Sequence, residues 1–312
     1  MKQRLITAII LNVAVALIFV LRQFVSAYIF DALLCLVIII SANEVARVFN
    51  RSGRLNNSTL ITIYPVLSFV GFYFGMKYEL NMWYILLINL GLILALMLVE
   101  IVVVLITKNK LKSEFEKTKL TNTFSRFSVN KVLLTGFLML YPSFLLSSMY
   151  FINHIGAFEY LNISKFGTNI DFSLFFLLLP ILTTVATDTF AYLIGRLIKG
   201  PKLCPLISPN KTISGAIGGI LGGIIFGFGI YAIFVACGLI EAVLAPYVIV
   251  IYTILASIIS EIGDIFASII KRKARTKDYS SIFPGHGGFM DRLDGISFNV
   301  LFTLLFFMLF IF

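Results

Sequence analysis

Residues 82–107 read MWYILLINLGLILALMLVEIVVVLIT, with Glu100 as the only charged side chain. A helix of this length spans the roughly 30 Å hydrocarbon core of a bilayer. Similar apolar runs recur along the 312-residue chain, which is 59% hydrophobic and 13% charged. Soluble domains carry about 25% charged residues. We therefore predict an all-α, polytopic integral membrane protein.

Nine transmembrane spans are predicted from these runs. Their ranges are 5–21, 26–43, 59–76, 82–107, 132–152, 173–198, 213–237, 244–270 and 296–312. The first run follows Lys2 and Arg4 and could be mistaken for a signal peptide. Because Arg22 and Gln23, rather than a small-residue cleavage site, follow it, we expect a retained helix.

Positive charge predicts the orientation. With the N-terminus inside, 22 of the 25 Lys and Arg residues fall on the inner side, leaving Arg22, Lys77 and Lys165 outside. Cytoplasmic loops carry such an excess. We therefore predict a multi-pass protein of the cell (inner) membrane with a cytosolic N-terminus and an external C-terminus. The segment 108–131 is expected to be a polar cytosolic connector between a four-helix group, 1–107, and a five-helix catalytic region, 132–312.

The net charge of +10 predicts anionic partners such as lipid head groups, nucleotides or phosphates. Nucleic acid is not expected as a partner, because no soluble basic domain is present to bind it. Cys35, Cys204 and Cys237 are isolated, which argues against a disulfide framework or a zinc site. With only His154 and His286, a histidine-rich metal site is not expected either.

A glycine stripe marks the seventh span, with glycine at every fourth position: 215, 219, 223 and 227. Small residues on one helix face permit close backbone contact. We interpret the stripe as a packing face, either within the subunit or across a dimer. The alternative is space for a lipid chain. We also expect the protein to be a homodimer.

Near the end of the sixth span, Thr184, Asp188, Tyr192 and Gly195 share one helical face. A carboxylate within a span is costly unless it is paired, so Asp188 is a functional candidate. The alternative is a structural ion pair with a neighbouring Lys or Arg. After this span, Ser208-Pro-Asn-Lys211-Thr212 leads into the seventh. Backbone N–H groups at a helix start, a lysine and hydroxyls suit phosphate, although the same pattern is an ordinary helix entrance.

The densest polar cluster lies between Ser268 and Asp294 and holds six basic side chains. It contains Lys271-Arg272, Lys277, Pro284-Gly-His286-Gly287-Gly288 and Asp291-Arg292-Leu-Asp294. Glycines let the backbone approach a ligand, Lys and Arg bind phosphate oxygens, and spaced aspartates suit Mg²⁺. A stripe of Ser257, Glu261, Asp264 and Ser268 precedes the cluster. Asp264 and Asp291 are therefore expected to hold Mg²⁺ together. The basic run alone would only anchor topology, and His286 alone could be structural.

The stretch from Ser268 to Asp294 resembles the signature of the phosphatidate cytidylyltransferases, the CDP-diacylglycerol synthases. Gly263-Asp264, Asp188 to Arg196 and Ser208 to Thr212 resemble further segments of that family. Two positions depart from its pattern, because Ser214 and Ala267 stand where the family usually has Glu.

The resemblance implies transfer of the cytidylyl group of CTP to phosphatidic acid. It implies that Asp264 and Asp291 bind the metal, with a second cation left open, and that Ser208, Lys211 and Thr212 belong to the CTP loop. We expect Gly287 and Gly288 to approach CTP as well. The remaining catalytic candidates are Lys271, Arg272, Lys277, His286, Arg292 and Asp188. Arg292 is expected to pair with phosphate or with Asp188.

Two other functions fit parts of the sequence. A related enzyme acting on another lipid, either CDP-archaeol synthase-like or a CTP-dependent polyprenol kinase, would use similar phosphate-binding groups. A transporter would place Asp188, Glu261 and Asp264 along a pathway near the midplane of the bilayer. No internal repeat supports the transporter.

Overall fold

The computed structural model describes residues 2–114, 121–158, 172–240 and 244–310. The chain forms two compact units, described separately below: Met1–Asp31 with Ser148–Phe312, and Ala32–Ser147. Lys165 and residues 115–120 of the predicted connector lie outside the described residues.

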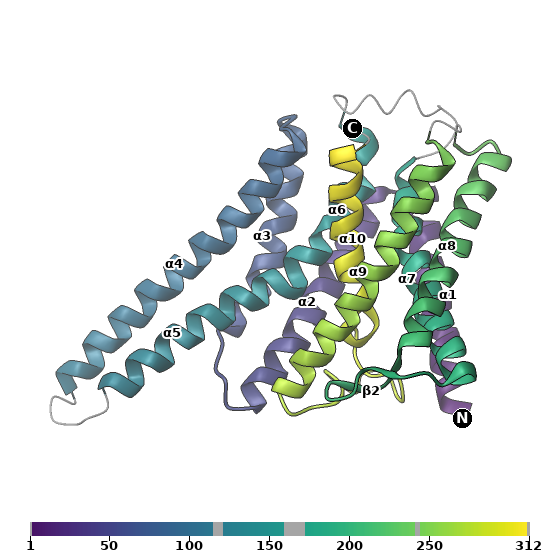
Figure 1. Ribbon diagram of the computed structural model, residues 1–312. Helices are drawn as coiled ribbons and strands as arrows, with labels where there is room; N and C mark the ends of the chain where they lie inside the picture. The colour runs from purple at the N-terminus through teal and green to yellow at the C-terminus, as the bar shows by residue number, and fades with distance from the viewer. Residues whose placement is uncertain (1, 115–120, 159–171, 241–243, 311–312) are drawn as a thin grey trace. The chain divides into compact units, whose positions relative to one another are not determined.

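The elements are almost all helices (Figure 1). In chain order they are α1 (Lys2–Phe24), α2 (Ala27–Arg51), α3 (Ser58–Lys77), α4 (Met82–Glu114), α5 (Thr121–Leu138), the π-helical turn η1 (Met139–Phe144), α6 (Leu145–Asn153), the 3₁₀ turn η2 (Ile155–Ala157), α7 (Phe172–Ile198), strands β1 (Lys202–Cys204) and β2 (Ser208–Thr212), α8 (Ile213–Ala236), α9 (Pro246–Lys273) and α10 (Met290–Phe310). Within the described residues, eight helical spans are long and apolar enough to cross a membrane, and the apolar helix Ile9–Phe24 precedes them. The prediction of an all-α, polytopic membrane protein is confirmed.

Two predicted segments take a more specific form. The span predicted at 132–152 is built from α5, η1 and α6, with Pro142 inside the π-helical turn. The polar connector predicted at 108–131 is helical where it is described, because α4 continues to Glu114 and α5 begins at Thr121. Proline lacks the N–H that an α-helix interior requires, which accounts for the interruption at Pro142.

The first compact unit contains the helices that carry the predicted chemistry. In it, α8 packs against α7 and α9, and α10 packs against α7 and α9 (Figure 1). The glycine stripe of α8 lies at these contacts. A Cβ atom at Gly219 would lie 2.9 Å from the Thr187 carbonyl oxygen, and one at Gly215 would lie 2.8 Å from that of Ala191. The stripe therefore packs helices within the chain.

Residues 1–31 belong to this unit, whereas the predicted grouping placed them with 32–107. A buried polar network connects them to the end of α6. Arg22, whose exposure is 3%, donates from Nε to Asn153 Oδ1 at 2.8 Å. Asn153 donates to Asp31 Oδ1 at 2.8 Å, and His154 Nε2 lies 2.5 Å from Asp31 Oδ2. Buried polar groups that are hydrogen-bonded to one another in this way are tolerated in an apolar interior.

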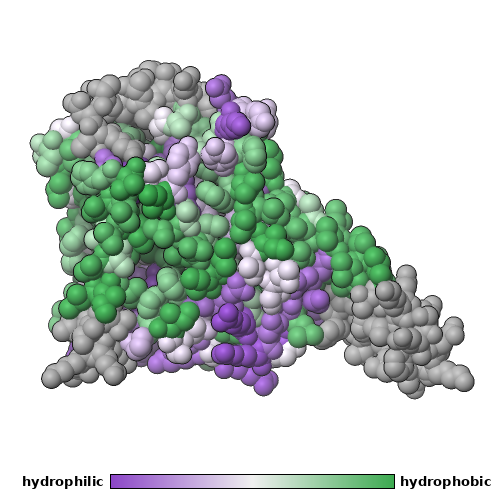
Figure 2. Space-filling view, turned by 180° about the vertical axis from the view of Figure 1, so that it is seen from behind, coloured by the Kyte–Doolittle hydropathy of each residue, from purple (hydrophilic) through white to green (hydrophobic). Residues whose placement is uncertain are grey.

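The second unit is built on α2–α5 and η1, and α4 contacts both α3 and α5. Its surface and that of the first unit carry many large hydrophobic side chains, such as Leu94, Leu98 and Ile225, which are 63%, 62% and 63% exposed. Figure 2 shows broad hydrophobic areas over the helices, with hydrophilic side chains gathered toward the lower edge of this face. Exposed apolar helix faces are expected where the solvent is lipid.

Candidate active site

The core of the candidate site is an ion pair between α9 and α10. Lys271, in the last turn of α9, places Nζ 3.0 Å from Oδ1 of Asp291, in the first turn of α10. Their side chains are 12% and 4% exposed. Oδ2 of Asp291 accepts hydrogen bonds from the backbone N–H groups of Tyr279 at 2.8 Å and Gly288 at 2.9 Å. One carboxylate thus joins two helices to two points of the intervening loop.

Tyr279 holds this loop against α9. Its hydroxyl donates to the carbonyl oxygen of Ala267 at 3.2 Å, and the ammonium nitrogen of Lys271 lies 5.2 Å from the centre of its ring. The tyrosine is only 2% exposed. Ala267, which stands where the family usually has Glu, is completely buried next to Tyr279. A charged side chain there would require a partner inside the protein.

The glycine-rich turn follows from backbone geometry. Gly285 and Gly287 have φ values of 76° and 83°, a region that side chains with a Cβ rarely adopt. A Cβ at Gly287 would also lie 2.8 Å from Asp291 Oδ2. The turn is closed by a hydrogen bond from Phe283 N to the Gly287 carbonyl oxygen at 2.8 Å. Nδ1 of His286 is buried and has no hydrogen-bond partner in this turn.

A second ion pair connects α9 to the segment before α8. Lys211 Nζ lies 2.7 Å from Asp264 Oδ2, and the two side chains are 24% and 29% exposed. The segment predicted as a loop forms a short antiparallel hairpin of β1 and β2, which contains Lys211. Ser208 begins β2. Lys211 and Asp264 are brought together although they lie more than 50 residues apart in the chain.

Thr212 caps α8, because its hydroxyl accepts the N–H of Gly215 at 3.1 Å. The close contact of α8 with α7 depends on two glycines here. A Cβ at Gly195 would lie 2.8 Å from the Thr212 hydroxyl and 3.3 Å from the Gly215 Cα. The ordinary capping role considered for this loop is therefore present, and it fixes where Lys211 leaves β2.

Four carboxyl groups, from α7, α9 and α10, interact electrostatically near the two lysines. Asp188 on α7 interacts electrostatically with Asp264 and Glu261 on α9, with Asp294 on α10 and with Lys211. Asp294 Oδ2 lies 3.8 Å from Lys271 Nζ, so this carboxylate also faces the first ion pair. Oε1 of Glu261 is buried and has no hydrogen-bond partner. The site therefore combines a cluster of carboxyl groups with two lysines.

The donor set fits a hard divalent cation. Mg²⁺ binds one or two carboxylates together with substrate phosphates, and Asp264, Asp294 and the orphaned oxygen of Glu261 supply oxygen donors. Within the described residues, no group of three or more His, Cys, Asp or Glu side chains is arranged to hold a metal ion by itself. No contact among these residues joins Asp264 directly to Asp291, and both oxygens of Asp291 already have partners.

The other basic candidates lie around the loop. Arg272 donates to the carbonyl oxygens of Ile207 at 3.2 Å and Thr276 at 3.3 Å, which connects the hairpin to the end of α9. Arg292 donates twice to the carbonyl oxygen of His286, at 3.0 and 2.8 Å, rather than to Asp188. Lys277 is exposed and has no partner in the described part of the chain.

Three residues of the site had no catalytic or metal-binding role assigned from the sequence: Glu261, Tyr279 and Asp294. Their signals were present, because Glu261 shares a helical face with Asp264 and Asp294 ends the quoted signature. The role of Tyr279 depends on the path of the loop and had no local signal.

Comparisons with known proteins identify the family to which the chain is similar. The model of the cytidylyltransferase family matches residues 2–310. A phosphatidate cytidylyltransferase of Brucella abortus (strain 9-941) is 44% identical over 115 residues, 36% of this chain and 38% of that protein. Its counterpart in Staphylococcus saprophyticus is 38% identical over 125 residues, 40% of this chain and 46% of the relative. The Aquifex aeolicus protein of that name is 31% identical over 177 residues, 56% and 57% of the two chains.

These matches cover between 38% and 57% of the relatives' own lengths, whereas the family model extends over nearly all of this chain. The two lysine–aspartate pairs, the glycine turn and the membrane-spanning helices that carry them all lie within the matched range. On this evidence the chain belongs to the cytidylyltransferase family.

Proposed function

We propose that this protein transfers the cytidylyl group of CTP to phosphatidate, giving CDP-diacylglycerol and pyrophosphate for phospholipid synthesis. The observation that carries the proposal is the convergence of the Lys271–Asp291 and Lys211–Asp264 pairs at one end of a bundle of apolar helices. Such a site suits one substrate from water and one from the membrane. The named activity of the relatives supports the same reaction.

A lipid phosphate is already an anionic nucleophile at neutral pH, so no activated serine or cysteine is required. An oxygen of phosphatidate attacks the α-phosphorus of CTP, a new P–O bond forms, and the bond to pyrophosphate breaks. The difficulty is to bring two polyanions together, so positioning and electrostatic stabilisation carry catalysis.

The lysines are proposed to bind phosphate oxygens. Lys211 and Lys271 are each held by a carboxylate in advance, at 2.7 and 3.0 Å, so their ammonium groups are oriented before the substrates arrive. Lys277 and Arg272 extend this positive surface. Tyr279 restricts Lys271 by packing its ring near the ammonium group.

Mg²⁺, when bound, would neutralise charge on the CTP phosphates. Asp264 is the residue proposed to hold it, and Asp291 would have to release Lys271 to contribute. Asp188 and Glu261 each interact electrostatically with Lys211, and we propose that they help to position it for its phosphate contact. We further propose that this end faces the cytoplasm across the cell membrane, where CTP is available.

The decisive experiment measures CDP-diacylglycerol formation by the purified protein from labelled CTP. Activity is expected only with phosphatidate and Mg²⁺, and removing the metal with a chelator should abolish it. Parallel reactions with a polyprenol or an archaeol-type phosphate test the alternative acceptors. Product formation from one of these and not from phosphatidate would overturn the proposal.

Asp264→Asn tests the site within this assay, because it keeps the shape of the side chain and removes its charge. We expect product formation to fall by about a hundredfold or more. Glu79→Gln, an exposed acid in the turn between α3 and α4, is the matched control and should retain activity. A wild-type rate for Asp264→Asn would remove Asp264 from the proposed metal site.

A further inference from the structure

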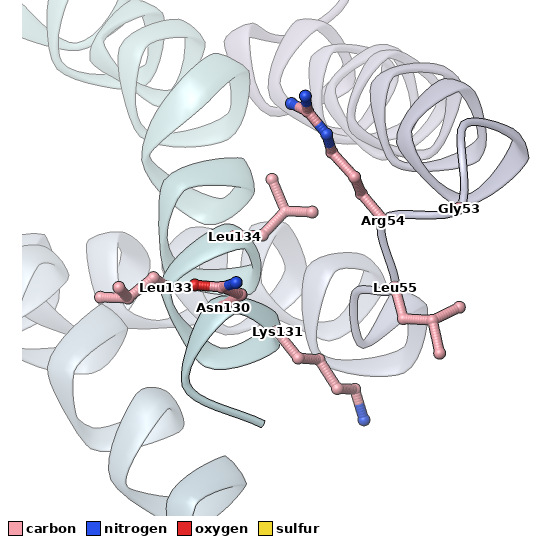
Figure 3. Close-up of a pocket in the computed structure, with 7 residues that line it drawn as sticks. All are labelled: Gly53, Arg54, Leu55, Asn130, Lys131, Leu133 and Leu134. Carbon is pink, nitrogen blue, oxygen red and sulfur yellow. The ribbon is translucent and has the colours of Figure 1, made fainter. Parts of the chain in front are cut away.

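We propose that a pocket in the second compact unit binds the phosphate headgroup of an anionic membrane lipid. The pocket has a volume of about 550 Å³. It is lined by residues of the α2–α3 connection and the second half of α5: Gly53, Arg54, Leu55, Asn130, Lys131, Leu133 and Leu134 (Figure 3). Its volume lies within the range of small-ligand sites.

One wall of the pocket is fixed by the way α2 ends. Gly53 has a φ of 79°, and its N–H donates to the Asn50 carbonyl oxygen at 3.0 Å. The N–H of Arg54 donates to the Phe49 carbonyl oxygen at 3.0 Å. These two bonds form a Schellman motif, which requires the left-handed conformation that glycine supplies. The backbone of Arg54 is therefore held in place, while its guanidinium has no partner in the described part of the chain.

The opposite wall is fixed by a buried acid. Lys131 Nζ lies 3.6 Å from Oε1 of Glu100, a residue of α4 with no exposed surface. The Thr135 hydroxyl lies 3.3 Å from the same oxygen and accepts the N–H of Asn57 at 3.0 Å. The hydrogen bond between Asn57 and Thr135 joins the α2–α3 connection to α5. Both walls are thus tied together, and Lys131 is oriented before any ligand binds.

The pocket lies where membrane-spanning segments begin and end. Arg54 and Leu55 stand between the candidate spans Ala27–Arg51 and Ser58–Lys77, and Lys131 stands near the start of Val129–Asn153. Leu55 and Leu133 are 46% and 57% exposed. Two cations beside exposed leucines, at a membrane boundary, match a molecule that has both a phosphate and an acyl chain. Nucleotides and free phosphate lack an acyl chain that could contact the leucines.

This inference does not depend on the proposed function, because none of these residues belongs to the candidate active site. The experiment uses the full-length protein in nanodiscs with a photoactivatable phosphatidylglycerol and, separately, a photoactivatable phosphatidylcholine. Cross-linked peptides that contain residues 53–55 or 129–134 are quantified by mass spectrometry. Excess inorganic phosphate is added in a further sample.

We expect the anionic lipid to label the pocket preferentially. Arg54→Gln and Lys131→Gln should each lower that labelling about fivefold. Arg51→Gln removes a nearby exposed cation that does not line the pocket, so it should leave labelling unchanged. Lys131→Arg should retain labelling, which separates loss of charge from damage to the Glu100 contact.

Two results would overturn the inference. Equal labelling by both lipids, unaffected by the glutamine variants, would mean that Arg54 and Lys131 only anchor the helices. Displacement of the anionic lipid by inorganic phosphate would mean that the pocket takes a free phosphate instead of a lipid.

Discussion

At the scale of single residues, the candidate site depends on pairing charges that an apolar protein cannot leave alone. Lys271 and Asp291 are nearly buried, and each satisfies the other. The same contacts order the loop between α9 and α10, because Asp291 accepts two of its backbone N–H groups. The Asp291 carboxylate therefore has a structural role in addition to its proposed role in catalysis. Variants at this position must be tested for both stability and activity.

Asp291→Asn is predicted to lower stability as well as activity. It removes the charge partner of Lys271, and the amide cannot accept all the bonds that the carboxylate accepts. We expect a destabilisation of about 2 kcal/mol, seen as a fall of the thermal unfolding midpoint in detergent. Glu79→Gln is the control for removal of an exposed acid. An unchanged midpoint would contradict the structural role of the pair.

Lys211→Ala is predicted to weaken the use of CTP with little loss of stability, since Lys211 is 24% exposed. Loss of one charged contact to phosphate should raise the KM for CTP about tenfold. Steady-state kinetics at saturating phosphatidate measure this directly. Lys77→Ala, on another helix end, serves as the control, and unchanged kinetics of Lys211→Ala would exclude Lys211 from the site.

At the scale of elements, the glycine stripe of α8 determines how closely α7, α8 and α9 approach. Gly219 leaves room for Glu261, because a Cβ there would lie 2.7 Å from Oε1. Gly215 leaves room for the carbonyl of Ala191 on α7. This packing brings Asp188, Lys211 and Asp264 to one place from three separate segments.

Gly215→Ala is therefore predicted to destabilise the protein by about 1–3 kcal/mol, because its new Cβ would meet backbone atoms that cannot turn away. Gly229→Ala is the matched control on the same helix, since nothing lies within 4 Å of its Cβ position. Alanine there should be neutral or stabilising by up to about 1 kcal/mol. Equal unfolding midpoints for the two variants would contradict the packing role of the stripe.

At the scale of the whole molecule, orientation is the property that links the site to its substrates. Two native cysteines flank α8, with Cys204 in β1 before it and Cys237 at its C-cap. If α8 spans the bilayer as predicted, these thiols lie on opposite sides of the membrane. The chain thus provides its own topology probes.

In intact cells, a membrane-impermeant maleimide is predicted to label Cys237 and not Cys204. Cys204→Ser and Cys237→Ser variants leave one of these thiols each, and inverted vesicles should reverse the pattern. Cys35 is buried and common to both variants. Labelling of Cys204 alone in intact cells would place the candidate active site outside the cell.

The glycine stripe of α8 is not available as the interface of the expected homodimer. The glycines of α8 that were expected to serve packing are used within the chain, against α7 and α9. We therefore propose that any dimer forms through other helix faces. Light scattering of the detergent-solubilised protein would measure the mass of the assembly.

The sequence by itself determined that this is a helical membrane protein, because apolar runs of span length admit no other solution in a bilayer. It also determined the family, because the signature is a local run of residue types at set spacings. The glycine turn followed as well, since its conformation depends on residues that are neighbours in the chain.

Only the tertiary structure decided which charges meet. Lys211 pairs with Asp264 and Lys271 with Asp291, and residue spacing predicted neither contact. Glu261 and Asp294 join the site, and residues 1–31 belong with the C-terminal helices. Ion pairs and helix packing depend on contacts between distant segments, and residue spacing along one helix does not contain that information.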